Sequence, residues 1–139
     1  MSFVLDTCVV SELQKVGCPA AVVGWVARQQ SDDLFVSVIT LGEIRFGLNR
    51  MPAGRKRSEL SAWMEGFRGG VADRVLPIGE KTAEVWGGVT ASSESAGRKV
   101  EPADGLIAAT AIEHGFTVVT RNVKDFEPTG VAVLNPWSE

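Results

Sequence analysis

Four carboxylates and one amide are spaced along the chain so that an α/β fold would bring them to one place: Asp6, Glu43, Asp104, Asn122 and Asp125. Asp6 follows the apolar run 3–5, and Asn122 follows the β-rich run 117–119. Because ligands of an open parallel sheet bind just beyond the carboxyl ends of its strands, side chains that follow two strands and others on nearby helices can share one crevice. We therefore expect one acidic site.

The chemistry of such a site follows from its charge. Carboxylates that crowd together repel one another unless a hard cation lies between them. Phosphate chemistry with Mg²⁺ is the first hypothesis, and Mn²⁺ is a plausible substitute.

Each acidic residue also has an ordinary structural interpretation. Asp6 would cap a helix that begins at Thr7, and Asp104, just after Pro102, would favour a helix N-terminus through the helix dipole. Glu43 would form a capping box with Thr40 unless the helix starts earlier, at Ser37. Capping explains why each residue is polar, but it does not explain why the series fits one pocket.

Length and composition limit the class of protein. The chain has 139 residues, a formal charge of −3, 45 % hydrophobic and 22 % charged residues, which predicts one domain over residues 1–139. Attraction to nucleic acid would need a local basic patch or a metal ion. Cys8 and Cys18 are interpreted as buried free thiols. Without a secretory signal or a membrane span, a cytoplasmic protein is expected.

Short β-rich runs alternate with longer helical patterns, which predicts an α/β fold with a parallel sheet. The predicted strands are 3–5, 34–36, 75–78, 117–119 and 131–134, with the third weakened by Pro77 and therefore at an edge or very short. The predicted helices are 7–15, 19–30, 37–49, 58–67, 80–96 and 102–115, and 51–57 is expected to be a solvated connection.

Four segments in series resemble the PIN-domain ribonucleases, in particular the VapC-like and FitB-like toxins. They are Val4-Leu5-Asp6-Thr7, the stretch 37–47 (SVITLGEIRFG), the stretch 103–111 (ADGLIAATA) and the stretch 119–126 (VTRNVKDF). The tail 134–137 (LNPW) is similar to the FitB-like branch. The resemblance covers nearly the whole chain and implies a three-layer α/β/α fold with a mostly parallel sheet of about five short strands.

The resemblance also implies a metal-dependent endoribonuclease. Asp6 and Asp104 are then the expected Mg²⁺ ligands, and Glu43 is expected to hold or activate a water. In many relatives the residue at position 122 is aspartate, so Asn122 is a departure that should weaken attraction for a second cation. Asn122, Asp125 or both complete the pocket.

Several supporting roles follow from these motifs. Thr7 and Thr120 are placed to hydrogen-bond a carboxylate or a water. Candidates for contacts with substrate phosphates are Arg45, Arg98, Lys99, Arg121 and Lys124. His114, near a predicted helix end, is explained by the dipole, and the four tryptophans are expected to be packed in a core or subunit interface.

The implied partners are an RNA substrate and a small antitoxin whose tail blocks the acidic groove. The resemblance further implies a homodimer, a larger complex with antitoxin, and contact with operator DNA only through the antitoxin. The alternatives are a PIN-like interaction module with weakened catalysis and an aspartate-based phosphotransferase or phosphatase. The phosphatase alternative is disfavoured because Cys8 stands where a second aspartate is needed.

Overall fold

The structure, a computed structural model, describes residues 1–138. Five parallel strands form one sheet in the order β3-β2-β1-β4-β5: β1 (Phe3–Leu5), β2 (Leu34–Ser37), β3 (Val75–Leu76), β4 (Thr117–Val119) and β5 (Val133–Leu134). β1 is central and pairs Val4 with Phe35 of β2 and with Val118 of β4. The predicted parallel sheet of five short strands is confirmed, and β3 lies at an edge as Pro77 indicated.

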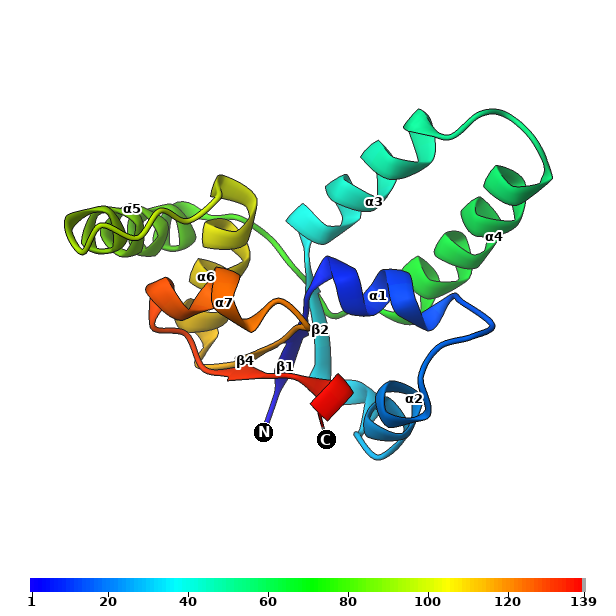
Figure 1. Cartoon of the computed structure of the whole chain (residues 1–139), viewed down its shortest axis with the longest axis horizontal. Helices are drawn as coiled ribbons and strands as arrows, with labels where there is room; N and C mark the ends of the chain where they lie inside the picture. Colours follow the sequence, from blue (N-terminus) through cyan, green and yellow to red (C-terminus); the bar gives the residue numbers. More distant parts are fainter. Residues whose placement is uncertain (139) are drawn as a thin grey trace.

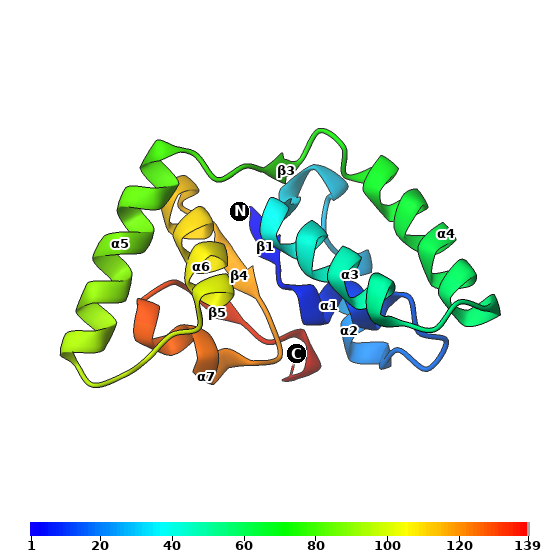
Figure 2. The ribbon, with the colours of Figure 1, turned by 90° about the horizontal axis from the view of Figure 1, so that it is seen from above.

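The helices form layers on both faces of the sheet (Figures 1 and 2). They are α1 (Thr7–Leu13), α2 (Ala20–Ala27), α3 (Val38–Arg50), α4 (Arg55–Gly70), α5 (Glu80–Ser95), α6 (Pro102–His114) and the short α7 (Val123–Phe126). Figure 2 shows α4 and α5 as the outermost helices on opposite sides. Three one-turn 3₁₀ helices complete the elements, at Ser31–Asp33, Glu127–Thr129 and Pro136–Ser138.

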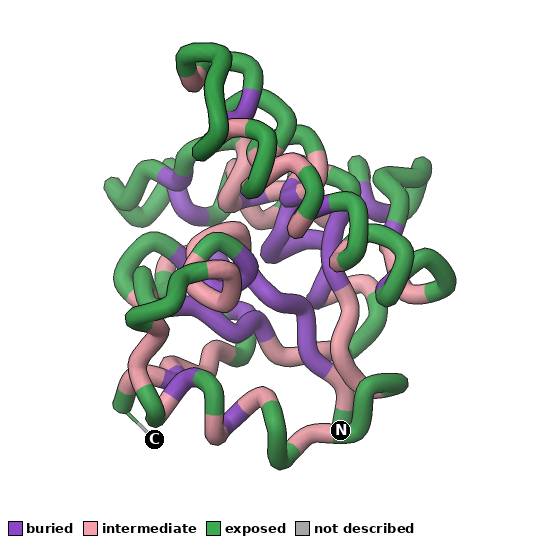
Figure 3. Tube along the Cα trace, turned by 90° about the vertical axis from the view of Figure 1, so that its right-hand side faces the viewer, coloured by how far each residue is buried: buried purple, intermediate pink, exposed green. Residues whose placement is uncertain are grey.

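The alternation of side chains along β1 divides the core into two clusters. Phe3 and Leu5 face a cluster that includes residues of α1, α2, α3 and α4. Val4 faces the other way, toward a cluster of residues from α6 and α7. Successive side chains of a strand point to opposite faces, so a strand of three buried residues needs cover on both. Figure 3 shows buried positions gathered in the middle of the molecule. The three-layer architecture is thereby confirmed.

The helices differ from the prediction at several boundaries, including the end of α1 at Leu13 and the end of α4 at Gly70, and by one additional helix. α4 begins at Arg55 rather than Ser58, because Gly54 ends the connection and the cations 55–57 form the first turn of the helix. α2 ends at Ala27 rather than near residue 30, and a 3₁₀ turn leads into β2. α7 was not predicted, since a helix of four residues is too short to show an apolar period. α6 ends as expected at Gly115, whose φ of 72° lies in the left-handed region that glycine adopts readily.

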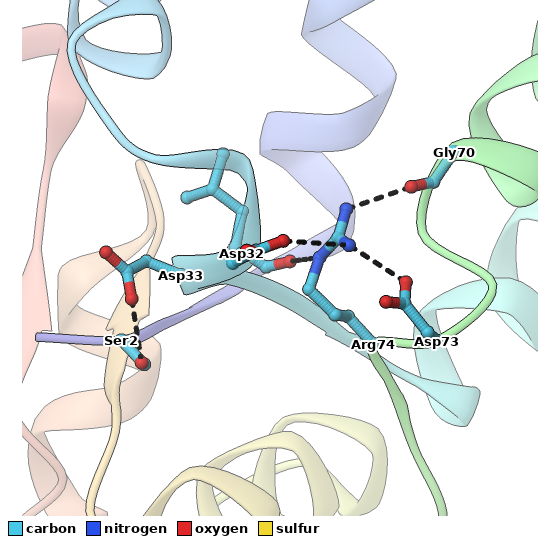
Figure 4. Close-up of polar contacts among 7 residues, drawn as sticks. Ser2, Asp32, Asp33, Gly70, Asp73 and Arg74 are labelled. Carbon is cyan, nitrogen blue, oxygen red and sulfur yellow. Dashed lines mark hydrogen bonds and ion pairs between the residues drawn. The ribbon is translucent and has the colours of Figure 1, made fainter.

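The amino-terminal edge of the sheet is held by Arg74, which precedes β3 (Figure 4). Its guanidinium donates to the carbonyl oxygens of Leu34, at 3.0 Å, and Gly70, at 2.9 Å. It also donates to Asp73 at 2.8 Å and lies 3.8 Å from Asp32. With a side chain only 13 % exposed, Arg74 joins the end of α4 to the starts of β2 and β3.

Among residues 1–138, no helix has the length and apolar character needed to cross a membrane.

Candidate active site

Asp6 lies where β1 ends and α1 begins, at the carboxyl edge of the sheet. Its backbone N–H continues the strand ladder by donating to Val119 O at 2.9 Å, and its φ and ψ of −69° and 157° are those of a helix N-cap. Asp6 is only 5 % exposed. The capping interpretation of Asp6 is therefore correct, and the carboxylate lies at the carboxyl edge of the sheet.

The two carboxylate oxygens of Asp6 are held by neighbours from two strand ends. The Thr7 N–H donates to Oδ1 at 2.8 Å, and the Thr120 hydroxyl donates to Oδ2 at 2.8 Å. Thr120 is itself buried and accepts from the Asn122 N–H at 3.0 Å. The predicted roles of Thr7 and Thr120 as hydrogen-bond donors to a carboxylate are confirmed.

Glu43 is brought to Asp6 by α3. The Ser37 hydroxyl caps this helix by accepting from the Ile39 N–H at 3.1 Å, so Glu43 lies in mid-helix and the capping box with Thr40 does not form. The Thr7 hydroxyl donates to Glu43 Oε1 at 2.5 Å and lies 3.2 Å from Thr40 Oγ1. Thr7 thus binds Asp6 through its backbone and Glu43 through its side chain.

Asp104 lies in the first turn of α6, which begins at Pro102 after an extended Glu101. The next residue, Gly105, lets α6 approach α5 closely, since a Cβ there would lie 3.1 Å from Trp86 Nε1. Asp104 is half-buried. Burial, followed by the negative charges of Asp6, Asp125, Glu43 and Glu101, raises the pKa of Asp104 to about 6.

Asn122 and Asp125 lie at the start of α7, after β4. Both side chains are exposed. Asn122 occupies the N-cap position without accepting a capping hydrogen bond through its side chain, whereas Asp125 is close enough to raise the pKa of Asp104. Of the two, Asp125 is the one whose charge acts on Asp104.

The structure therefore brings four predicted carboxylates into one electrostatic group: Asp6, Glu43, Asp104 and Asp125. None of the ion pairs formed within residues 1–138 involves any of them. Their mutual repulsion is thus not offset by a neighbouring lysine or arginine.

This group fits a hard divalent cation. The donors are oxygens, and a cation would offset both the burial and the like-charge repulsion that raise the pKa of Asp104. Within the described part of the chain, no three acidic, histidine or cysteine side chains are close enough to form a complete metal cluster. Mg²⁺ does not need such a cluster, because it retains several waters and is held by one or two carboxylates.

The predicted phosphate-binding cations are distributed unevenly. Arg45 lies 4.0 Å from Glu65 and Arg98 lies 3.5 Å from Glu127, so both are directed toward carboxylates outside the acidic group. Arg121 follows Thr120 and lies over the Trp137 ring, with its guanidinium carbon 5.3 Å from the ring centroid. Lys99 and Lys124 are exposed.

Two residues near the acidic group were not found from the sequence. Glu101 contributes to the raised pKa of Asp104. Cys8, interpreted as an ordinary buried thiol, is half-buried and lies 3.4 Å from Asp6 Oδ2. Its position two residues after Asp6, in the first turn of α1, was the available signal.

Comparison with known proteins gives a consistent picture. The model of the PIN domain family matches residues 3–130. The chain is 42 % identical over 135 residues to "VapC ribonuclease Y4jK" of Sinorhizobium fredii, covering 96 % of each protein. It is 35 % identical over 136 residues to "Toxin FitB" of Neisseria gonorrhoeae, covering 97 % of this chain and 98 % of that protein. Among solved structures, a chain of FitAB bound to an IR36 DNA fragment superposes with a TM-score of 0.92 at 35 % identity, covering 97 % of this chain and 95 % of that one.

Proposed function

Because this chain belongs to the PIN-domain family, we propose that it is a Mg²⁺-dependent endoribonuclease and the toxin of a toxin–antitoxin pair. The observation that carries the proposal is the group of four carboxylates at the carboxyl edge of the sheet, which no ion pair within residues 1–138 neutralises. RNA is the proposed substrate because a relative 42 % identical to this chain is named a ribonuclease.

Each site residue has a proposed role. Asp6, buried and held at both oxygens, and Asp104, half-buried at the helix start, hold the cation. When bound, Mg²⁺ activates a water molecule and neutralises the charge that develops on the scissile phosphate. Asp125, Asn122 or both complete the pocket from the start of α7.

Glu43 is proposed to orient the attacking water and accept its proton. The hydrogen bond from the Thr7 hydroxyl fixes one of its oxygens, Oε1, and ties that oxygen to the same residue that holds Asp6. A general base has to be held within hydrogen-bond reach of the proton that it removes. Thr7 therefore fixes the position of the proposed base, Glu43, relative to the proposed metal ligand, Asp6.

The decisive experiment is incubation of antitoxin-free protein with total RNA and Mg²⁺ or Mn²⁺, followed by mapping of the cleaved ends. Discrete cleavage that needs the metal ion and is lost in Asp6→Asn is the expected result. If the folded protein cleaves no RNA under these conditions, the proposal is wrong, and an interaction module with weakened catalysis becomes the better interpretation.

A partner is proposed on the same basis. A basic tail that enters a carboxylate-lined groove gains charge-assisted hydrogen bonds, most strongly through a bidentate arginine. We expect such a tail to compete with Mg²⁺, and we expect DNA to be bound through the partner rather than through this chain of net charge −3. The same proposal places the protein in the cytoplasm as a homodimer or a larger symmetric assembly.

The partner is tested by co-purification with the product of the adjacent reading frame and by adding that product back to the cleavage reaction. Loss of cleavage at saturating partner is expected. Undiminished cleavage would contradict inhibition, and a monomer by light scattering would contradict the assembly.

A further inference from the structure

Cys8 contacts the most buried carboxylate of the site. Its Sγ lies 3.4 Å from Asp6 Oδ2, within the limit for a sulfur donor, and 3.5 Å from Thr120 Oγ1. Thr120 has a single hydroxyl hydrogen, and at 2.8 Å this hydrogen goes to Asp6 Oδ2. Thr120 therefore cannot also donate to the sulfur, and the Cys8 thiol is the donor.

The Asp6 carboxylate then has three donors for about four lone-pair positions. Oδ2 accepts from the Thr120 hydroxyl and the Cys8 thiol, and Oδ1 accepts from the Thr7 N–H. Oδ2 is fully occupied, and only Oδ1 retains a lone pair for another partner. Rotation of the carboxylate would break two or more of these bonds.

We propose that Cys8 is a positioning residue of the acidic site, whose thiol holds the Asp6 carboxylate in the orientation in which it binds the divalent cation. This inference rests on the proposed function, because it concerns the same site. The proposed role explains why the first turn of α1 carries a thiol at position 8, where a small apolar side chain would be enough for packing.

A purely structural role for Cys8 makes the opposite prediction for two substitutions. Cys8 also packs against the hydrophobic cluster around Phe3 and Leu5. If packing alone matters, Cys8→Ala is tolerated better than Cys8→Ser, because serine buries a hydroxyl in place of an apolar group. If the donor matters, Cys8→Ser is tolerated better than Cys8→Ala, because a hydroxyl also donates to a carboxylate.

The test compares wild type, Cys8→Ala, Cys8→Ser and the control Cys18→Ala. Cys18 is the other free thiol and is also half-buried, and the charged neighbours that act on it are Glu12 and Lys15, which lie outside the site. Mn²⁺ affinity is measured by calorimetry, folding by the unfolding midpoint, and cleavage by kcat and KM on the RNA that wild type cleaves.

We expect Cys8→Ala to weaken Mn²⁺ binding by about 3- to 10-fold and to lower kcat more than it raises KM. This is at or below the ~10–100-fold typical for groups that orient metal ligands, since a thiol is a weak donor. Cys8→Ser should stay within about twofold of wild type, and Cys18→Ala should match wild type.

A folded Cys8→Ala protein with wild-type Mn²⁺ affinity, or a Cys8→Ser protein that binds Mn²⁺ more weakly than Cys8→Ala, would overturn the role of Cys8 and leave the proposed function standing. A wild-type protein that neither binds Mn²⁺ nor cleaves RNA would overturn both.

Discussion

Carboxylates cluster at both ends of the central sheet, but an arginine pairs with them at one end only. At the amino-terminal edge, Asp32 and Asp73 lie beside Arg74, whose other hydrogen bonds go to backbone carbonyls (Figure 4). At the carboxyl edge, Asp6 and Asp104 lie in a group that no ion pair within residues 1–138 neutralises, and the pKa of Asp104 is raised to about 6.

The paired carboxylates at the amino-terminal edge serve stability, whereas the unpaired carboxylates at the carboxyl edge serve the proposed function. Arg74 donates hydrogen bonds to two backbone carbonyls and to a carboxylate, and these bonds fix the local conformation of the chain. Its positive charge is thereby paired within the protein. A group of carboxylates without an arginine costs stability in the absence of a cation and provides a site in its presence. The amino-terminal end contributes to the stability of the fold, and the carboxyl end is the proposed cation site.

The largest expected effect is at the carboxyl edge. Asp104→Asn should lower RNA cleavage by about 100-fold or more, because it removes a charge on which the cation depends. The same change should raise the unfolding midpoint without metal, since it relieves like-charge repulsion. Cleavage assays and thermal unfolding with and without Mn²⁺ measure the two effects.

The matched control is Glu101→Gln, which removes the carboxylate with the smallest effect on Asp104 and should change cleavage little. Near-wild-type cleavage by a folded Asp104→Asn protein would reject the assignment of Asp104.

The opposite result is expected at the amino-terminal edge. Arg74→Met removes the charged hydrogen bonds to Leu34 O and Gly70 O and should lower the free energy of unfolding by about 2 kcal/mol. Cleavage per folded molecule should not change. Denaturant unfolding measures the loss, with Arg55→Met as the control because the Arg55 side chain is 91 % exposed in its pair with Glu59. Equal free energies of unfolding for Arg74→Met and Arg55→Met would contradict the stabilising role of the amino-terminal edge.

The pH dependence of stability sharpens the comparison. The pKa of Asp104 is raised from 3.8 to about 6 in the folded protein, so the folded state binds this proton more tightly than the unfolded state. Without metal, stability should therefore fall as pH rises from about 4 through about 6, and the loss should be complete above that range. After allowance for solvent screening of a half-buried group, we expect a loss of about 1 to 1.5 kcal/mol.

Thermal unfolding of metal-free protein from pH 4.5 to 7.5 measures this loss. Asp104→Asn should flatten the profile in this range, and Mn²⁺ affinity should decrease below about pH 6 as protons compete for the carboxylate. A profile that is the same in wild type and Asp104→Asn would contradict the raised pKa.

The smallest expected effect concerns the residue that departs from many relatives. Asn122→Asp adds a charge at the start of α7 and should tighten Mn²⁺ binding by about two- to fivefold if the side chain turns toward the pocket. Asp125→Asn should weaken binding by more, because Asp125 already acts on Asp104. Calorimetry on both variants decides between them, and unchanged affinity in Asn122→Asp would leave Asp125 as the residue that completes the site.

The sequence predicted most of the architecture because the signals were strong and local. The strands are short runs of β-branched and other large apolar residues, and Pro102 and Gly115 mark both ends of α6. Pro77 placed β3 at an edge. The start of α4 was wrong because the cations 55–57 look like a loop in sequence, whereas in the structure they form its exposed first turn.

The site was predicted less completely because its geometry is non-local. That Asp6 and Glu43 would lie near enough to act on Asp104 could be inferred from their positions after a strand, within a helix and at a helix start. The hydrogen bond between Thr7 and Glu43 and the contact of Cys8 with Asp6 and Thr120 depend on side-chain directions that spacing does not give. The sequence also could not show which of Asn122 and Asp125 acts on the acidic group; in the structure, the charge of Asp125 acts on Asp104.

The order of strands in the sheet determines when during synthesis this site can form. β1 is made first, yet it is the central strand, and its second neighbour is β4 at Thr117–Val119. The Asp6 N–H donates to Val119 O and the Asp6 carboxylate accepts from the Thr120 hydroxyl, so the support of Asp6 is incomplete until Thr120 has been synthesised. Because chains grow at about 5–20 residues per second, the nascent protein spends several seconds with its first strand unpaired on one side. A nascent chain that has not yet reached Thr120 therefore lacks the two hydrogen bonds that join Asp6 to the end of β4.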